Sequence, residues 1–282
     1  MRILLSGGSG FLGTNFYQWL KRREPDIDIL VFSRRTGHDV RDYEDVEREV
    51  SKSYLVINLA AQTHVDFSLH RELEAQHNFI STNVNGTLNM IHACRKHKVK
   101  LIHCSTSEVY GSNVQKGKPM TEEHPILAQA GIYATSKACA DLTCRMSFLT
   151  EGDNIVIVRP FNLWGCHQSV EKFIPRIINQ ISKGEPVTIY GDGEQRRDYV
   201  YAPDACEAIW LAKDLPAGTT VNIAAEKNYS VNEIVGMVNS CFPNTSGEGY
   251  IDTKNVGARP AEVRELLGSY RKLNKLTGWK PT

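Results

Sequence analysis

The chain has 282 residues and a formal net charge of +1. This length suits one large domain or two unequal ones, with a core that needs no covalent cross-links. The near-neutral charge gives no electrostatic basis for a nucleic-acid or membrane partner, and no apolar run reaches transmembrane length. Seven scattered cysteines without a Cys-x-x-Cys pair predict reduced thiols in a cytoplasmic protein, and no metal site is expected.

The first predicted elements are a strand, a glycine-rich turn and a helix. An apolar run at residues 3–5 precedes three glycines spaced three residues apart, and apolar residues then recur with helical spacing. A turn without side chains, placed before the free N–H groups of a helix N-terminus, suits a pyrophosphate. This context favours dinucleotide binding over an ordinary tight turn. The residues expected to hold the dinucleotide are Gly7, Gly10, Phe11, Leu12 and Gly13.

The second predicted strand, Ile27 to Phe32, ends at the sequence Ser33-Arg34-Arg35. An acidic side chain at this position accepts hydrogen bonds from the ribose hydroxyls of NAD, and none is present here. A hydroxyl and two guanidinium groups suit a ribose phosphate instead. The sequence therefore favours NADP over NAD, and the alternative is that both arginines are solvated loop charges.

Two further stretches are expected to line the dinucleotide. Asp39 and Val40 precede a predicted helix at residues 43–50 and are expected to flank the adenine, with a helix cap as the alternative. A third strand at residues 55–59 leads into two alanines, which let a cofactor pass close to the backbone. The contacts expected from this strand end are Leu59, Ala60 and Ala61.

A long helical stretch, Arg71 to His97, is predicted before the fourth strand, Val99 to Cys104. Gly86 lies inside this helical stretch, where glycine is unfavourable, so a packing reason is expected. Strands that alternate with helices predict a parallel, doubly wound sheet with right-handed crossovers. Such sheets bind ligands beyond the carboxyl ends of their strands, so the segment at residues 105–111 is expected to face the site.

Tyr133 and Lys137 lie four residues apart in a helix predicted from about Ile132 to Leu149, and therefore share one face. A neighbouring ammonium group favours the phenolate form of a tyrosine. Because free tyrosine has a pKa of about 10, use of Tyr133 as a base near neutrality requires a fall of several units. Taken alone, the two residues prove little, because an ordinary exposed pair is the alternative; the predicted dinucleotide-binding turn is what favours a catalytic role.

The remaining sequence completes the predicted fold. A further strand at residues 154–159 is followed by a change of character near Gly165. We predict an α/β protein with a Rossmann-type, doubly wound parallel sheet and a smaller C-terminal α/β substrate-binding region. Residues 1–165 are expected to form the dinucleotide-binding domain, and residues 166–282 to form mainly the substrate-binding region. Within the second part we predict helices at 172–183 and 203–213 and a strand at 187–190.

Together these stretches resemble the extended short-chain dehydrogenase/reductases, in the group of nucleotide-sugar epimerases and dehydratases. The resemblance covers nearly the whole chain. Residues 61–68 and 168–175 are similar to sugar-nucleotide 4,6-dehydratases in particular. Thr106-Ser107-Glu108 resembles both the GDP-mannose 4,6-dehydratases, which use NADP, and the UDP-glucuronate decarboxylases. The motifs that carry the resemblance are the glycine turn, Leu59-Ala60-Ala61, the segment 105–111, Tyr133 with Lys137, residues 159–162, residues 190–193 and Arg197-Asp198.

The resemblance implies a cycle that begins with oxidation at C4 of the sugar in a nucleotide-diphosphate sugar. Tyr133 takes the proton of the C4 hydroxyl, Thr106 hydrogen-bonds near that oxygen, and Lys137 holds the phenolate and the nicotinamide ribose. The new ketone acidifies C5, so that Glu108 removes the C5 proton and water leaves C6, assisted by Ser107 or a bound water. Many dehydratases carry an aspartate at the position of Ser107, so the identity of the general acid stays open.

The same resemblance implies the other ligand contacts and a partner. Decarboxylation and 4-epimerisation share the first oxidation and remain alternatives, as does an NADP-binding sensor without turnover. A homodimer is expected, formed through the helix that holds Asn83 and the helix that holds Tyr133. For Arg197, a salt bridge to Asp198 or to another surface acid is the alternative to a substrate contact. Pro160 is expected at the cofactor, and Asn162, Lys172, Val187, Tyr190, Arg197 and Arg259 at the substrate.

Overall fold

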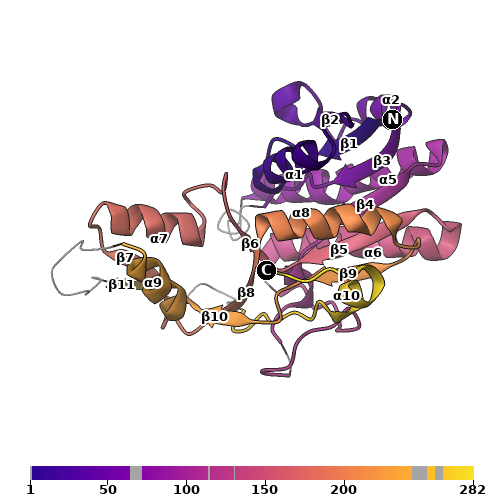
Figure 1. The fold of residues 1–282 in the computed structure, drawn as a ribbon. Helices are drawn as coiled ribbons and strands as arrows, with labels where there is room; N and C mark the ends of the chain where they lie inside the picture. Colours follow the sequence, from indigo (N-terminus) through magenta and orange to yellow (C-terminus); the bar gives the residue numbers. More distant parts are fainter. Residues whose placement is uncertain (1, 64–71, 114, 130, 243–252, 258–262) are drawn as a thin grey trace.

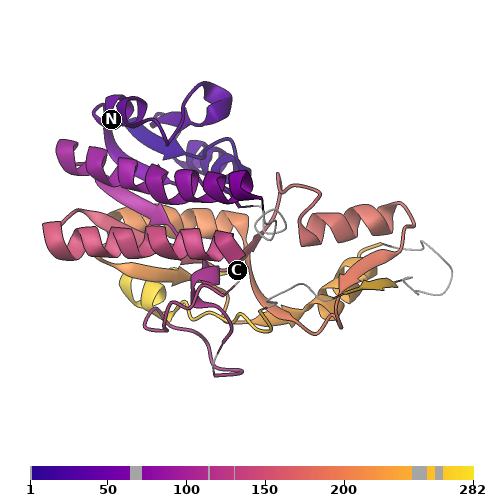
Figure 2. The same ribbon diagram turned by 180° about the vertical axis from the view of Figure 1, so that it is seen from behind.

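The computed structural model describes residues 2–63, 72–113, 115–129, 131–242, 253–257 and 263–282. Figures 1 and 2 show a large lobe built on a sheet with helices on both faces, and a small lobe that extends from one side of it. The large lobe holds six parallel strands in the order β2-β1-β3-β4-β5-β9. The predicted fold class, a doubly wound parallel sheet of the Rossmann type, is therefore confirmed.

The strands of the large sheet are almost continuously apolar, because helices cover both faces. Their carboxyl ends lie at one edge of the sheet, since all adjacent pairs are parallel. The strands are β1 (Arg2–Ser6), β2 (Asp28–Phe32), β3 (Ser53–Asn58), β4 (Lys100–Cys104), β5 (Ile155–Pro160) and β9 (Thr220–Ile223).

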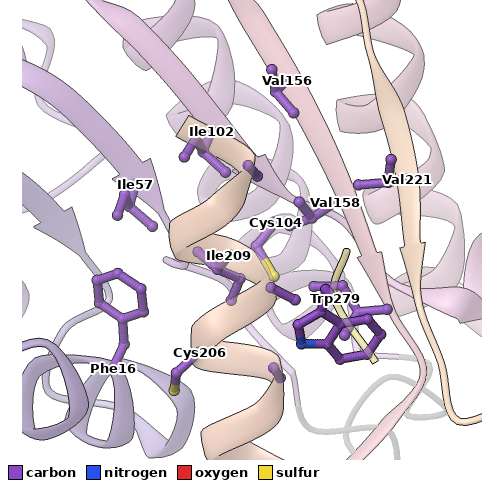
Figure 3. Close-up of a cluster of buried hydrophobic side chains, with 14 of the residues drawn as sticks. Phe16, Ile57, Ile102, Cys104, Val156, Val158, Cys206, Ile209, Val221 and Trp279 are labelled. Atoms are coloured by element: carbon purple, nitrogen blue, oxygen red, sulfur yellow. The ribbon is translucent and has the colours of Figure 1, made fainter. Parts of the chain in front are cut away.

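Two helical layers enclose the sheet. On one face lie α1 (Phe11–Arg23), α8 (Ala202–Leu211) and α10 (Arg271–Thr277), whose apolar residues share one buried cluster with the sheet. Figure 3 shows this cluster, with Ile209 of α8 and Trp279 packed near the side chains of β4 and β5. The opposite face is covered by α2 (Tyr43–Val50), α5 (Gly86–His97) and α6 (Gly131–Glu151).

The predicted helix at 71–97 is interrupted in the middle. Its described part consists of α4 (Leu73–Phe79), a π-helical turn (Ile80–Asn85) and α5. A Cβ added at Gly86 would lie 2.7 Å from Cγ2 of Val40. The expected packing reason for this glycine is confirmed, because the start of α5 lies directly against the loop before α2.

The predicted boundary after Gly165 does not divide the structure. Strand β9 pairs in parallel with β5, and α8 packs against α1, so the chain returns to the large lobe after residue 201. The C-terminal segment including α10 also packs on the large sheet. The prediction failed here because the open edge of β5 is completed by a strand more than 50 residues later, a pairing that local sequence does not encode.

The small lobe has its own core between two helices and short strands. It begins at the carboxyl end of β5, because β6 starts two residues after β5 ends. Two small sheets, ordered β10-β8-β6 and β11-β7, support the helices α7 and α9, which pack together around Ile177, Ile234 and neighbouring apolar residues. The elements are β6 (Asn162–Trp164), α7 (Phe173–Ser182), β7 (Val187–Tyr190), β8 (Arg196–Tyr201), β10 (Asn228–Ser230), α9 (Val231–Ser240) and β11 (Thr253–Val256).

Short helical turns complete the described chain, and two of them lie at strand ends of the large sheet. They are η1 (Arg34–Thr36), which follows β2, η3 (Ser107–Tyr110), which follows β4, and η4 (Ala212–Asp214), which follows α8. All seven cysteines are free. Among the residues described, no helix combines the length and the apolar character needed to cross a membrane.

Candidate active site

The glycine turn between β1 and α1 is fixed by close backbone contacts. Gly7 has a φ of +68°, donates its N–H to the Phe32 carbonyl oxygen at 2.9 Å, and would place a Cβ 2.7 Å from the Ala60 nitrogen. A Cβ at Gly13 would lie 2.5 Å from the Cα of Gly8. These two glycines therefore let the turn, the end of β3 and the start of α1 pack at backbone distance.

The start of α1 suits an anionic group. Gly10, an exposed residue, occupies the N-cap, no side chain caps the helix, and its first turn holds no acidic residue. A Cβ at Gly10 would meet only the Gly7 carbonyl oxygen within 4 Å, at 3.2 Å. The uncapped N–H groups and the positive end of the helix dipole therefore fit the pyrophosphate of a dinucleotide. Phe11 and Leu12 are half-buried beside this turn.

The Ser33-Arg34-Arg35 segment lies beside the glycine turn, because β2 pairs with β1. The Ser33 and Thr36 hydroxyls form a capping box for η1. Arg34 and Arg35 are exposed, and Nη1 of Arg35 lies 3.5 Å from the Ser9 carbonyl oxygen within the turn. The guanidinium of Arg35 is thus close to the place where the helix N-terminus accepts an anion.

The expected adenine contacts, Asp39 and Val40, already have partners within the chain. The Asp39 carboxylate binds the guanidinium of Arg41, and this hydrogen bonding lowers the pKa of Asp39 below its ordinary value. Val40 is buried against the start of α5. The alternative for this stretch, a helix cap, is present: Asp42 occupies the N-cap of α2 and accepts from the Glu44 and Asp45 N–H groups.

A buried polar row crosses three strands at the carboxyl edge of the sheet, and sequence reasoning missed it. Ser6 donates to Oδ1 of Asn58 at 2.5 Å and accepts from the Ala60 N–H at 3.3 Å. Nδ2 of Asn58 lies 3.4 Å from Nδ1 of His103, which is fully buried. Burial, reinforced by the Lys137 charge, lowers the pKa of His103 well below its usual value, so this imidazole is neutral. The available signal was a polar residue near the end of each of three otherwise apolar strands.

Tyr133, Thr106 and Glu108 meet at the end of β4. The Thr106 side chain lies near Tyr133, and the Glu108 N–H donates to Oγ1 of Thr106 at 3.3 Å. Burial raises the pKa of Tyr133 above its ordinary value, the Thr106 hydroxyl lowers it, and the Glu108 charge raises it further. A base near neutrality would need a lowered pKa, but the groups of the chain alone raise the pKa of Tyr133, because the effect of burial exceeds that of the Thr106 hydroxyl.

Lys137 joins α6 to the end of β4. Its Nζ is buried and donates to the Cys104 carbonyl oxygen at 2.6 Å, and burial lowers its pKa. One turn of α6 is anchored on its other side, since Nδ2 of Asn83 donates to the Ser136 hydroxyl at 2.9 Å and Oδ1 of Asn83 accepts from the Gln62 N–H at 2.7 Å. Contacts with β4 and with the π-helical turn therefore hold the turn of α6 that carries Tyr133 and Lys137, and the π-helical turn is itself bonded to the segment after β3.

Ser107 and Glu108 differ in access. The residue Ser107 is only 2% exposed, whereas Glu108 is half-buried. Both belong to η3, whose N-cap is Thr106. Of the two neighbours in this turn, Glu108 offers the more accessible side chain for a reacting group.

A second unpredicted element is a buried ion pair beneath this site. Nε and Nη2 of Arg159 donate to the two carboxylate oxygens of Asp141 at 2.9 and 2.8 Å, and both side chains are almost fully buried. Nη1 of Arg159 donates to the Tyr110 hydroxyl at 2.9 Å, which in turn donates to Oδ1 of Asn222 at 2.7 Å. This network ties α6, β5, η3 and β9 together around the end of β5, where Pro160 is buried.

The predicted substrate residues are distributed over the start and the interior of the small lobe. Asn162, Lys172 and Tyr190 are half-buried, and Nζ of Lys172 lies 3.2 Å from the Thr63 carbonyl oxygen of the large lobe. Val187 is 0% exposed in the core of the small lobe, so the structure gives it no surface for a nucleotide base. Arg259 lies outside the described residues, and so do residues 64–68 of the stretch that resembles the 4,6-dehydratases.

The carboxylate of Asp198 is hydrogen-bonded to backbone N–H groups. It accepts the N–H groups of Ala225, Glu226 and Gly268 at 2.8 to 3.1 Å, and burial raises its pKa to about 7. These contacts fix the end of β9 and the segment before α10 onto β8. Arg197, on the next position of β8, donates through Nη1 to the Arg196 carbonyl oxygen at 3.0 Å. The hydrogen bonds of Asp198 thus assign it a structural role, separate from the arginine that precedes it.

Comparison with known proteins gives a consistent result. The family model described as "NAD dependent epimerase/dehydratase family" matches residues 3–224. A dTDP-glucose 4,6-dehydratase from Mycobacterium tuberculosis is 34% identical over 227 residues, covering 74% of this chain and 67% of the relative. One from Streptomyces niveus is 32% identical, covering 100% of this chain and 88% of the relative.

Two solved structures share the whole fold. A dTDP-glucose 4,6-dehydratase from Streptomyces venezuelae, solved with NAD bound, is 26% identical with a TM-score of 0.88, and the match covers 100% of this chain and 92% of that chain. A UDP-glucose 4-epimerase from Thermotoga maritima, solved with UDP-glucose, is 25% identical with a TM-score of 0.89, covering 100% and 94%.

Proposed function

The chain belongs to the NAD-dependent epimerase/dehydratase family, and from this premise we propose that it is a nucleotide-sugar 4,6-dehydratase that oxidises the sugar transiently at C4. One observation carries the proposal. Tyr133 and Thr106 lie close together at the carboxyl end of β4, and both the Thr106 hydroxyl and the Glu108 carboxylate are near enough to shift the pKa of Tyr133. The site thus contains one group for a hydroxyl proton and a second for the proton of the adjacent carbon.

The first step is removal of the C4 hydroxyl proton by Tyr133. Thr106 hydrogen-bonds at the same oxygen and orients it, while Lys137, one helical turn along α6, is held by the Cys104 carbonyl oxygen. Since burial and Glu108 both raise the pKa of Tyr133, ionisation requires additional positive charge in the site. A bound oxidised nicotinamide dinucleotide supplies such charge, and also the hydride acceptance and return on which this reaction class depends.

The second step uses Glu108. A ketone at C4 acidifies the C5 proton, because the resulting carbanion is delocalised as an enolate. Glu108 removes that proton, and the C6 hydroxyl leaves as water when it receives a proton. Because Ser107 is buried, Glu108 or a water beside it is the stronger candidate for that proton donor. A carboxylate at C5 would instead leave as carbon dioxide, and rotation of the ketone before reduction would give the 4-epimer.

Cofactor choice follows from the segment after β2. We propose that the ribose phosphate of NADP binds Arg34 and Arg35, because Arg35 already reaches the glycine turn and no acidic side chain occupies residues 33–35. An Arg35→Ser variant is expected to lose NADP affinity by about tenfold, with NAD affinity changed by less than about twofold. Equal losses for both dinucleotides, measured by fluorescence titration, would contradict this assignment.

The reaction is tested by incubating the protein with UDP-, dTDP-, GDP- and CDP-hexoses and measuring product mass. The proposal expects loss of one water from one of these substrates, without net consumption of the cofactor. Loss of carbon dioxide from a uronate identifies the decarboxylase, and an unchanged mass with altered chromatography identifies the epimerase. Absence of any product, with intact cofactor binding, supports the sensor.

We also propose that the protein forms a homodimer through the face of α6 that carries Leu142, Met146 and Leu149. These residues follow each other at intervals of four and three, so they share one side of the helix. Their exposed fractions are 47, 49 and 69%, which is unusual for such a continuous apolar stripe on a single chain. A Leu142→Glu/Met146→Glu double variant is expected to sediment as a monomer, whereas unchanged sedimentation of a dimer would exclude this face.

A further inference from the structure

Tyr110, the last residue of η3, is the centre of a buried bridge between η3 and α6. Its hydroxyl accepts from Nη1 of Arg159 at 2.9 Å and donates to Oδ1 of Asn222 at 2.7 Å. The guanidinium carbon of Arg159 also lies 5.1 Å from the centroid of the Tyr110 ring. Through Nε and Nη2, Arg159 binds the carboxylate of Asp141 in α6 at 2.9 and 2.8 Å. Tyr110 is 1% exposed and Arg159 2%, so water does not compete for these bonds.

The two ends of this bridge belong to the two elements that carry the proposed reacting groups. In α6, Tyr133, Lys137 and Asp141 follow each other at intervals of four and so lie on one side of the helix. In η3, Tyr110 follows Glu108 by two residues within the same four-residue turn. The bridge therefore sets the spacing between the helix that holds Tyr133 and the turn that holds Glu108.

The start and the end of η3 are held in different ways. At the start, the residue before Thr106 donates its N–H to the Val158 carbonyl oxygen of β5 at 2.8 Å, so Thr106 follows directly from the sheet. The backbone bonds within the turn are long, 3.4 Å from the Val109 N–H and 3.3 Å from the Gly111 N–H. The end of the turn is held by the Tyr110 bridge and by the N–H groups of residues 127 and 128, which bond the Val109 carbonyl oxygen at 2.9 and 3.0 Å.

The two proposed steps act on adjacent carbons of one bound sugar, so their two groups need a fixed separation. In the second step the C5 proton passes to a carboxylate oxygen of Glu108, and the electron pair of the C–H bond is delocalised into the C4 ketone. A displacement of about 1 Å can cost roughly 100-fold in such a step. On the proposed function, and resting on it, we propose that Tyr110 is a positioning residue that holds Glu108 at the distance from Tyr133 that removal of the C5 proton requires.

The test compares the two steps in Tyr110→Phe, which keeps the ring and removes the hydroxyl. A nucleotide sugar that the wild-type protein converts is mixed with the dinucleotide-loaded variant, and the absorbance of reduced nicotinamide is followed. Because Thr106 is anchored by the sheet, reduced nicotinamide should form within about threefold of the wild-type rate, while its reoxidation with loss of water should slow by roughly 10- to 100-fold. Reduced nicotinamide should therefore accumulate. A substrate deuterated at C5 should show a larger isotope effect on turnover than in the wild type, because removal of the C5 proton then limits the rate.

Amide hydrogen exchange of the dinucleotide-loaded protein tests the bridge without a substrate. Tyr110→Phe is expected to speed exchange at the Val109 and Gly111 amides by about tenfold, and to leave the Lys137 amide unchanged. Tyr270→Phe is the matched control, since it removes the same hydroxyl from a residue packed in the helical layer on the other face of the sheet. This control should leave both steps and the exchange at η3 unchanged.

Three results would overturn the proposal. Equal slowing of both steps in Tyr110→Phe would show that the residue only supports the fold. Unchanged rates would show that Glu108 does not depend on the bridge, and wild-type exchange at Val109 and Gly111 would show that the bridge does not hold η3. A wild-type protein that converts no nucleotide sugar removes the proposed function instead, and the exchange measurement tells that result apart from a failure of the bridge.

Discussion

The two lobes hold their functional side chains in different ways. In the large lobe, Lys137 is 2% exposed and donates to the Cys104 carbonyl oxygen, and Thr106 caps η3 close to Tyr133. In the small lobe, Lys172 is half-buried at the N-cap of a ten-residue helix. The proposed reacting end of the site is therefore held by the sheet, whereas the proposed recognition end rests on a short helix.

The largest expected difference between the lobes concerns their ion pairs. Asp141→Asn leaves the buried Arg159 charge unpaired and is expected to lower the free energy of unfolding by about 3–5 kcal/mol. Asp192→Asn in the small lobe breaks the Arg264 ion pair, whose side chains are 51 and 67% exposed, and should leave the free energy of unfolding almost unchanged. Urea denaturation of both variants measures the two values, and similar losses would contradict the contrast.

A second contrast compares two glycines. Gly13→Ala places a Cβ 2.5 Å from the Gly8 Cα, so we expect a loss of about 1–3 kcal/mol and much weaker dinucleotide binding. Gly236→Ala in α9 meets nothing within 4 Å and should stabilise the protein by about 0.5–1 kcal/mol. Thermal unfolding with and without dinucleotide measures both effects. Normal dinucleotide binding by Gly13→Ala would show that the turn tolerates a side chain.

The smallest effect is a change in pH dependence. The carboxylate of Glu108 raises the pKa of Tyr133, so Glu108→Gln should lower it. C4 oxidation requires the deprotonated phenol and therefore speeds up as the pH rises through this pKa. The rising limb of the single-turnover rate should move to lower pH in Glu108→Gln, although dehydration is lost. A shift toward higher pH would contradict the placement of Glu108 beside the phenol.

Sequence reasoning succeeded where function depends on local order. Gly7 and Gly13 follow a strand and precede a helix, and the strand–helix alternation predicted the parallel sheet. Helical spacing correctly placed Tyr133 and Lys137 in one helix, α6. The rule for parallel sheets correctly placed the residues after β4 at the carboxyl edge of the sheet. Each of these features is determined within about ten residues of chain, which is the range over which periodicity and turn chemistry act.

The rest required contacts between distant segments. These contacts join residues that are 18 to 63 positions apart in the chain: the pairing of β9 with β5, the buried Asp141–Arg159 pair and the neighbouring contacts of the Ser6–Asn58–His103 row. Val187 illustrates the same limit, since a short strand pattern does not reveal which side chains its neighbours will enclose. Tyr110 was not singled out either, because only the folded chain brings its hydroxyl to Arg159.

The central claim is that Tyr133, held by Thr106 and α6, removes the proton whose loss starts sugar oxidation. The direct measurement is the single-turnover appearance of reduced nicotinamide absorbance when a nucleotide sugar that the enzyme converts is mixed with Tyr133→Phe. The account predicts a rate lower by about 10²- to 10⁴-fold, with dinucleotide affinity unchanged. A Tyr133→Phe protein that reduces the nicotinamide at the wild-type rate would contradict it.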